Sequence, residues 1–203
     1  MTILKKYIEK YINKHLEEES LLLKNLNKET KIKTKKKFCM MCGHYQGRVL
    51  STISKLIKPK SILEIGTFTG YSTLCLAEGL TKNGILITID INKKWENITK
   101  KYFSYSKYYR NIKQIYGNSI KIIPNLKKKF DLVFIDADKK NYIFYFNKII
   151  KKMYSGGVII TDNVLWYKKS FFIHFNYLCN TYYYFIIEIL KPFLIGRIIF
   201  SIL

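Results

Sequence analysis

Residues 61–72 read Ser-Ile-Leu-Glu-Ile-Gly-Thr-Phe-Thr-Gly-Tyr-Ser, and this stretch sets the fold class of the chain. Its apolar first half is typical of a buried strand, and residues 71–80 have the composition of a helix. Between them, Gly66 and Gly70 allow the backbone to turn tightly and to approach a ligand closely. The stretch therefore predicts a strand, a glycine loop and a helix whose first amides face back into the loop.

The chemistry of the loop argues against a pyrophosphate ligand. Its spacing is Gly-x-x-x-Gly, whereas dinucleotide folds use Gly-x-Gly-x-x-Gly, and Glu64 lies at the strand tip before the first glycine. A carboxylate there repels phosphate but can receive a cationic or hydroxyl-bearing ligand. Asp90 ends the next apolar run about twenty residues after Gly70, where a nucleotide-binding unit places its ribose acceptor. The alternative is an ordinary strand-to-helix turn in another α/β protein.

The composition fits one cytoplasmic domain. The chain has 203 residues, of which 48% are hydrophobic. No apolar run approaches the ~18 residues that span a membrane, and the N-terminus offers no signal peptide, so no membrane partner is expected. The net charge of +22 is compatible with nucleic-acid binding, but nearly all 36 basic residues are lysines spread over the chain. This pattern favours drift in an AT-rich genome over selection for nucleic acid.

The domain spans residues 1–203 and divides into three parts. Residues 1–58 carry apolar residues at helical spacing, which predicts N-terminal helices, with a basic connector at residues 31–37. Residues 59–166 alternate strands and helices, which predicts a parallel sheet covered by helices on both faces. Residues 167–203 hold two apolar runs, 182–190 and 197–203, and a link this short requires two strands to pair antiparallel. The fold class is therefore α/β with an antiparallel last strand.

Polar side chains gather where the strands are expected to end. They are Glu64, Asp90, Asn118, Asp136, Asp162 and Asn163. Ligands of open α/β sheets bind outside these carboxyl ends. The last three offer only oxygen ligands, which favours Mg²⁺, Mn²⁺ or Ca²⁺ over zinc. Helix capping is the alternative role for any one of them, and Ser119 is a candidate N-cap of the helix over residues 120–126.

Three motifs, in this order, closely resemble the cation-dependent O-methyltransferases, which include catechol and plant caffeoyl-CoA O-methyltransferases. They are residues 65–72 (IGTFTGYS), residues 134–142 (FIDADKKNY) and residues 162–166 (DNVLW), and the resemblance covers roughly residues 40–166. It implies the Rossmann-like fold of class I S-adenosylmethionine (SAM) methyltransferases, with a mostly parallel seven-stranded sheet and an antiparallel last strand. A homodimer is implied by the resemblance alone.

The resemblance also implies a role for each matching position. SAM contacts are implied at Cys42, Glu64, Gly66, Thr67, Ser72, Asp90, Asn118 and Asp136. Metal ligation is implied at Asp136, Asp162 and Asn163, and a catalytic base at Lys139. The chemistry agrees, because a divalent ion that binds two adjacent substrate oxygens lowers the pKa of the substrate hydroxyl. Lys139 then takes the remaining proton, and the oxygen attacks the methyl group in line.

The resemblance ends after Trp166, where the family has a longer segment that lines the substrate site. Three hypotheses follow. The favoured one is an O-methyltransferase acting on a small hydroxylated, catechol-like acceptor with SAM and Mg²⁺. The second is a tRNA hydroxyuridine O-methyltransferase, and the third is a degenerate remnant without activity. The intact set of Asp136, Asp162, Asn163 and Lys139 counts against the third.

Overall fold

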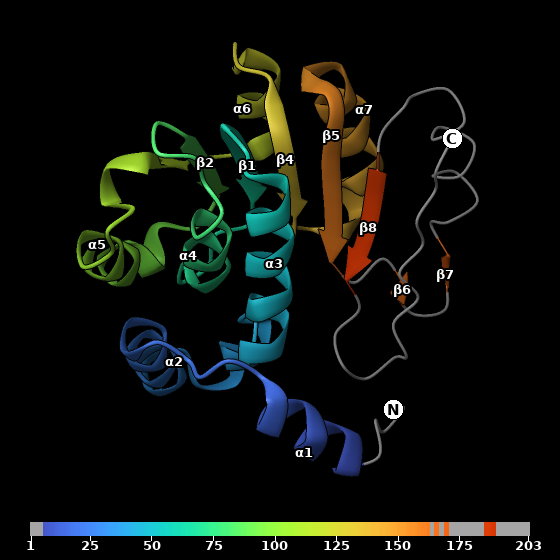
Figure 1. Cartoon of the computed structure of the whole chain (residues 1–203). Coiled ribbons are helices and arrows are strands. Elements are labelled where there is room, and N and C mark those ends of the chain that lie inside the picture. The colour runs from blue at the N-terminus through green and yellow to red at the C-terminus, as the bar shows by residue number, and fades with distance from the viewer. Residues whose placement is uncertain (1–5, 163–164, 167–168, 171–184, 190–203) are drawn as a thin grey trace.

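The computed structural model describes residues 6–162, 165–166, 169–170 and 185–189. From residue 61 onward strands and helices alternate, as the sequence predicts (Figure 1). The strands are β1 (Ser61–Ile65), β2 (Ile85–Asp90), β3 (Ile112–Tyr116), β4 (Phe130–Ile135), β5 (Met153–Asp162), β6 (Leu165–Trp166), β7 (Lys169–Ser170) and β8 (Phe185–Ile189). The α-helices are α1 (Lys6–His15), α2 (Leu21–Thr34), α3 (His44–Ile57), α4 (Tyr71–Ala77), α5 (Glu96–Ser104), α6 (Ser119–Asn125) and α7 (Tyr142–Ile149). The 3₁₀ helices are η1 (Lys35–Met40), η2 (Lys93–Trp95), η3 (Tyr109–Asn111), η4 (Lys139–Asn141) and η5 (Ile150–Lys152).

The main sheet confirms the α/β class. Its strand order is β3-β2-β1-β4-β5-β8, and every neighbouring pair is parallel. The order reverses at β1, which has β2 on one side and β4 on the other. Ligands bind at such a switch point in doubly wound sheets. Here the sheet has six strands and not the predicted seven, because the strand expected within residues 197–203, with its antiparallel direction, lies outside the described residues.

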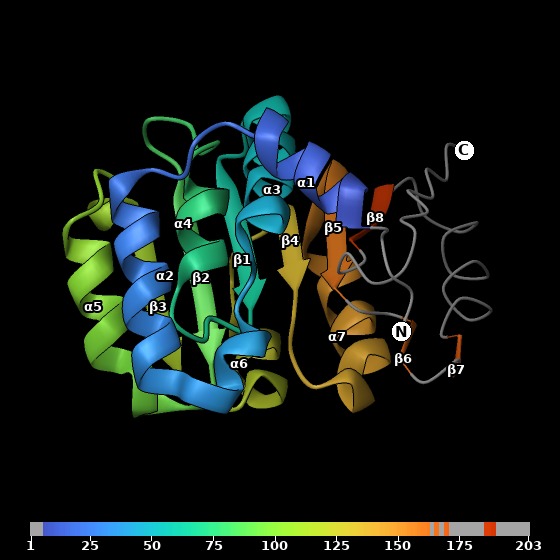
Figure 2. The same cartoon turned by 90° about the horizontal axis from the view of Figure 1, so that it is seen from below.

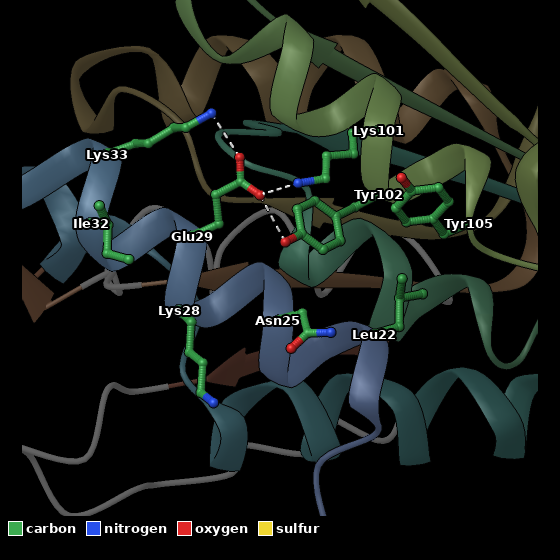
Figure 3. Close-up of a pocket in the computed structure, with 9 residues that line it drawn as sticks. All are labelled: Leu22, Asn25, Lys28, Glu29, Ile32, Lys33, Lys101, Tyr102 and Tyr105. Atoms are coloured by element: carbon green, nitrogen blue, oxygen red, sulfur yellow. Dashed lines mark hydrogen bonds and ion pairs between the residues drawn. The ribbon is translucent and has the colours of Figure 1, made fainter.

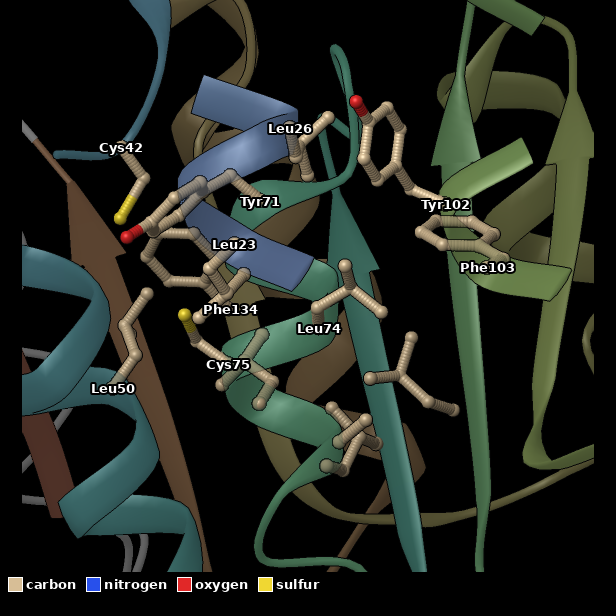
Figure 4. Close-up of a cluster of buried hydrophobic side chains, with 14 of the residues drawn as sticks. Leu23, Leu26, Cys42, Leu50, Tyr71, Leu74, Cys75, Tyr102, Phe103 and Phe134 are labelled. Carbon is tan, nitrogen blue, oxygen red and sulfur yellow. The ribbon is translucent and has the colours of Figure 1, made fainter. Parts of the chain in front are cut away.

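Helices cover both faces of the sheet, and the strand sequences explain how. Side chains alternate between the faces, so Ile62 packs with α3 and α4 while Leu63 and Ile65 pack with α6 and α7. Figure 2 shows these helix pairs on opposite sides of the strands. Figure 4 shows the first cluster, in which the ring of Phe134 lies beside Tyr71. Glu64 belongs to the same face as Ile62 and therefore points at α4.

Helices α1 and α2 lie across the carboxyl ends of the strands (Figure 1). Helix α2 begins at the predicted cap, because the Ser20 hydroxyl accepts a hydrogen bond from the Leu23 amide at 3.4 Å. The basic connector predicted over residues 31–37 is wrong in part, since α2 continues to Thr34 before η1 begins. Thr34, the last residue of α2, is buried, as is Thr30 one turn earlier, so packing against the rest of the protein stabilises the longer helix. Among the described residues, no helix has the length and apolarity to cross a membrane.

Candidate active site

The glycine loop lies where β1, β2 and β4 meet. The amide of Gly66 donates to the carbonyl of Ile89 at 2.9 Å, and the amide of Asp136 donates to the carbonyl of Ile65 at 2.9 Å. Gly66 has φ of +101°, and a Cβ there would lie 1.9 Å from the Asp136 carbonyl oxygen. Only glycine is compatible with both conditions. The predicted loop residue Gly66 thus brings the predicted residue Asp136 against the loop.

Asp90, at the end of β2, holds the shape of this loop. Its Oδ2 accepts hydrogen bonds from the amides of Thr67 at 3.1 Å and Phe68 at 2.7 Å, and its Oδ1 accepts from the amide of Asn92 at 2.8 Å. These bonds favour the left-handed backbone of Phe68, whose φ is +50°. A carboxylate oxygen can accept two hydrogen bonds. Oδ1 therefore retains room for a ligand hydroxyl, and the ribose role predicted for Asp90 stays a prediction.

Glu64 is buried beneath the first turn of α4. Its carboxyl accepts hydrogen bonds from the hydroxyls of Ser72 at 2.6 Å and Thr73 at 2.5 Å. Burial raises the pKa of Glu64 to about 7, although hydrogen bonds from hydroxyls oppose this effect. Two residues predicted to contact the cofactor, Glu64 and Ser72, therefore contact each other directly.

The ends of β4 and β5 are joined by the ammonium group of Lys139. Its Nζ lies 3.2 Å from Oδ1 of Asp136 and 3.0 Å from the backbone carbonyl oxygen of Asp162, and it also donates to the hydroxyl of Tyr142. The side chain of Lys139 is 17% exposed, and Asp162 is fully buried. The structure thus brings together three predicted residues, Lys139, Asp136 and Asp162, beside the glycine loop.

Tyr142 completes this arrangement and was not among the predicted site residues. Its hydroxyl lies 3.0 Å from the carbonyl oxygen of Asp162 and 3.3 Å from that of Ile135, and Nζ of Lys139 lies 4.6 Å from the ring centroid. Burial, followed by the charges of Asp136 and Asp162, raises the pKa of Tyr142, so the phenol stays protonated. One signal could have revealed it, because Lys139 and Tyr142 are spaced i, i+3 at a helix start, which places them on one face.

Cys42 lies just before α3 and close to the same carboxylates. It is 5% exposed, and burial raises the pKa of its thiol, with smaller contributions from its neighbours Cys75 and Asp162. The thiol is therefore a protonated side chain in the wall of the site. Figure 4 shows its sulfur pointing toward the hydroxyl of Tyr71.

Asn118 lies apart from these contacts. Asn118 is exposed and caps α6, because its side-chain oxygen accepts from the amide of Ile120 at 2.9 Å. The expected N-cap Ser119 is therefore wrong, since Ser119 is the first residue of the helix and is buried. The side chain of Asn118 therefore caps the helix, one residue earlier than expected. Asn163 lies outside the described residues.

Metal binding is not decided by this geometry. Among the residues that the structure describes, no group of three or more His, Cys, Asp or Glu side chains is arranged to hold an ion. The predicted set contains only two such residues, Asp136 and Asp162, and its third member is the amide Asn163. The metal assignment therefore stays a prediction.

Helix α2 covers the loop and is held there by two contacts. The hydroxyl of Thr30 donates to that of Thr69 in the glycine loop at 3.0 Å, in a buried position. Glu29 reaches α5, where it accepts from Nζ of Lys101 at 2.6 Å and from the hydroxyl of Tyr102 at 2.9 Å (Figure 3). The hydrogen bond from Lys101 is the main reason that the pKa of Glu29 is lowered to about 2. A cavity of about 510 Å³ lies beside these contacts, between α2 and α5.

Comparisons with known proteins all point to the O-methyltransferases. The model of the O-methyltransferase family matches residues 13–173. A catechol O-methyltransferase of Niastella koreensis is 36% identical over 124 residues, which make up 59% of this chain and 56% of that relative. The chain thus spans about half the length of this curated relative.

Solved structures agree. The O-methyltransferase TomG of Streptomyces achromogenes, involved in tomaymycin synthesis and crystallised with SAM, superposes with a TM-score of 0.73 and 26% identity, covering 81% of this chain and 76% of that chain. An O-methyltransferase of Bacillus cereus in complex with SAH superposes with a TM-score of 0.72 and 29% identity, covering 78% and 73% of the two chains.

Proposed function

Because this chain belongs to the O-methyltransferase family, we propose that it transfers a methyl group from SAM to a hydroxyl oxygen of a small acceptor. We assign the acceptor to compounds with two neighbouring hydroxyls, and the reaction to one that uses a divalent metal ion. The observation that carries the proposal is the position of Lys139, whose ammonium is bound by Asp136 and by the carbonyl of Asp162 beside the glycine loop.

The loop fits a cationic nucleoside donor. Glu64 lies near the end of β1, Asp90 ends β2 and Asp136 follows β4, and these neighbouring strands form the switch point of the sheet, where ligands bind. The carboxylates of Asp90 and Asp136 favour a sulfonium over a phosphate. Similar folds bind SAM and SAH in the solved structures of TomG and the Bacillus cereus enzyme. The SAM contacts are proposed at Cys42, Glu64, Gly66, Thr67, Ser72, Asp90, Asn118 and Asp136.

The donor set also fits a hard divalent ion. Asp136 and Asp162 supply carboxylates, and Asn163 would supply an amide oxygen, which are the ligands that Mg²⁺ and Ca²⁺ prefer. Asp162 is fully buried at the end of β5, and Lys139 links its backbone to Asp136. When bound, the ion would bring two acceptor oxygens together and lower the pKa of one hydroxyl.

Lys139 is the residue we assign to the proton transfer. Its amine form would accept the proton of the acceptor hydroxyl, leaving an oxygen nucleophile and a lysine ammonium. The oxygen then bonds to the methyl carbon as the carbon–sulfur bond breaks, so the sulfonium charge is lost in the same step. The ammonium that forms would be held by Asp136, Tyr142 and the Asp162 carbonyl, as it is in the structure.

A methyl-transfer screen tests the proposal. Purified protein with labelled SAM and Mg²⁺ should methylate a catechol such as caffeate, whereas a matched acceptor with one hydroxyl should react at least about tenfold more slowly because it cannot chelate. Methyl transfer to hydroxyuridine-containing tRNA, without transfer to catechols, would show that the acceptor is RNA and not a small molecule. If the protein does not bind SAM at millimolar concentration, the hypothesis of a degenerate remnant without activity is the one that remains. The homodimer stays a prediction.

A further inference from the structure

A lysine-lined cavity lies away from the candidate active site, at the amino ends of the strands. It is formed where α6 ends and β4 begins, against η5, and its volume is about 530 Å³. Five lysines line it, at residues 127–129 and 151–152. The parallel strands run from this end of the sheet toward the glycine loop. The lysine cavity is therefore at the opposite end of the sheet from Asp136 and Asp162.

The positive charge of this lysine cavity is not balanced by carboxylates. Among the described residues, none of the five lysines lies within 4.0 Å of a carboxylate. Asp131 is the nearest acid in sequence, and its Oδ2 is used by the amides of Lys60 and Ser61, both at 2.9 Å. The cavity therefore concentrates like charges, which costs free energy unless an anion is bound.

One of the five ammonium groups has a fixed position. Nζ of Lys152 donates to the carbonyl oxygens of Pro124 at 3.1 Å and Leu126 at 2.5 Å, so two of its three protons are used. This contact caps the end of α6 and brings η5 against the 127–129 turn. The other four lysines are exposed, so their ammonium groups can turn toward a ligand in the cavity.

We propose that the lysine cavity binds a small polyphosphate anion, meaning a chain of adjacent phosphate groups. A single phosphate carries roughly −1.5 to −2 charges and would leave most of the five cations unmatched. A long nucleic acid is disfavoured, because the described residues that line the cavity include no aromatic side chain for base stacking and no arginine. A membrane surface is disfavoured because Leu126, the apolar residue beside the lysines, is partly buried.

The test compares two triple variants of equal charge. Binding of inorganic tripolyphosphate to the full chain is measured by calorimetry for wild type and for two variants. The cavity variant is Lys127→Gln/Lys128→Gln/Lys151→Gln, and the matched variant is Lys35→Gln/Lys36→Gln/Lys37→Gln, which changes three exposed lysines elsewhere. Each lost ion contact weakens binding by roughly two- to fivefold, so the cavity variant should bind about tenfold or more weakly. The matched variant should stay within about twofold of wild type.

Binding of two further ligands, ATP and a poly(U) oligonucleotide, shows which kind of phosphate compound the cavity recognises. Equal affinity for tripolyphosphate and ATP indicates recognition of the phosphate chain alone, and tighter binding of ATP indicates a nucleotide; either supports the site. Equal losses in both triple variants would show an effect of net charge and overturn it. Cavity-dependent binding of a poly(U) oligonucleotide without binding of tripolyphosphate would also overturn it. If the triple variant folds poorly, the single substitution Lys128→Glu, at an exposed position, should also weaken tripolyphosphate binding. None of these results depends on methyl transfer.

Discussion

Replacing Glu64 by glutamine should stabilise the ligand-free protein at alkaline pH and leave it unchanged at acid pH. Glutamine has nearly the same volume and can still pair with the hydroxyls of Ser72 and Thr73. The pKa of Glu64 rises from its ordinary 4.5 to about 7 because the carboxyl is fully buried. At about 1.4 kcal/mol for each pKa unit, this difference corresponds to a cost of about 3 kcal/mol for the ionised form.

The sign follows from proton binding. Between pH 4.5 and 7 the unfolded chain has released this proton while the folded chain retains it, so the free energy of unfolding falls as pH rises. Above pH 7 both states are ionised and the full cost is present. Glu64→Gln removes this dependence. Its unfolding free energy should match that of wild type near pH 4.5 and exceed it by about 3 kcal/mol at pH 8.

Urea unfolding followed from pH 4.5 to pH 8 measures this difference. Glu78→Gln is the matched change with the opposite expected sign. Burial raises the pKa of Glu78, but hydrogen bonds from Arg48, Ser51 and Lys55 outweigh it and lower the pKa. That variant should therefore lose stability at pH 8. If Glu64→Gln differs from wild type by the same amount at both ends of the range, the titration assigned to Glu64 is wrong.

Three further changes test the contacts around the loop and the lysine. Tyr142→Phe removes the hydrogen bond from Lys139 and the contacts of the hydroxyl with the Asp162 and Ile135 carbonyls, and should lower kcat about 10- to 100-fold with unchanged SAM affinity. Tyr145→Phe, one turn along α7, should change kcat less than about twofold, and equal losses would show a general effect on the helix. Gly66→Ala should cost at least about 3 kcal/mol in urea unfolding, and Gly43→Ala, with no atom within 4 Å of the added Cβ, less than about 1 kcal/mol. Thr30→Val should cost about 1 kcal/mol by losing the bond between α2 and the loop, and an unchanged unfolding midpoint would contradict that contact.

Local patterns were sufficient to predict the framework of the fold. The apolar run before Gly66 and the acids at the strand ends placed β1, β2, β4 and β5, because a buried parallel strand must be apolar along its length. Boundaries between helix and connector were less predictable. Residues 31–34 are lysine-rich in part and read as a solvated link, yet buried Leu26 and Thr30 on the other face hold α2 in place.

The sequence indicated which residues to consider for the candidate site, but it did not indicate which contacts they make with one another. Nothing in the sequence fixes that the Asp90 carboxylate binds loop amides or that Glu64 faces Ser72, because both depend on strand register. Tyr142 was missed for the same reason, since its role arises from the approach of α7 to the end of β5. The three motifs place the resemblance at about residues 40–166, whereas the family model matches residues 13–173, so the motifs underestimated its extent at both ends.

Methyl transfer by Lys139→Gln, compared with Lys140→Gln, tests the central claim most directly. Lys140 is an exposed neighbour of the same charge, so it controls for expression, folding and net charge. With labelled SAM, Mg²⁺ and caffeate, the turnover of Lys139→Gln should fall about 100-fold or more, and that of Lys140→Gln should stay within about twofold of wild type. Chelation by EDTA should abolish activity in wild type. Wild-type turnover in Lys139→Gln, or activity that survives chelation, would contradict the proposed mechanism.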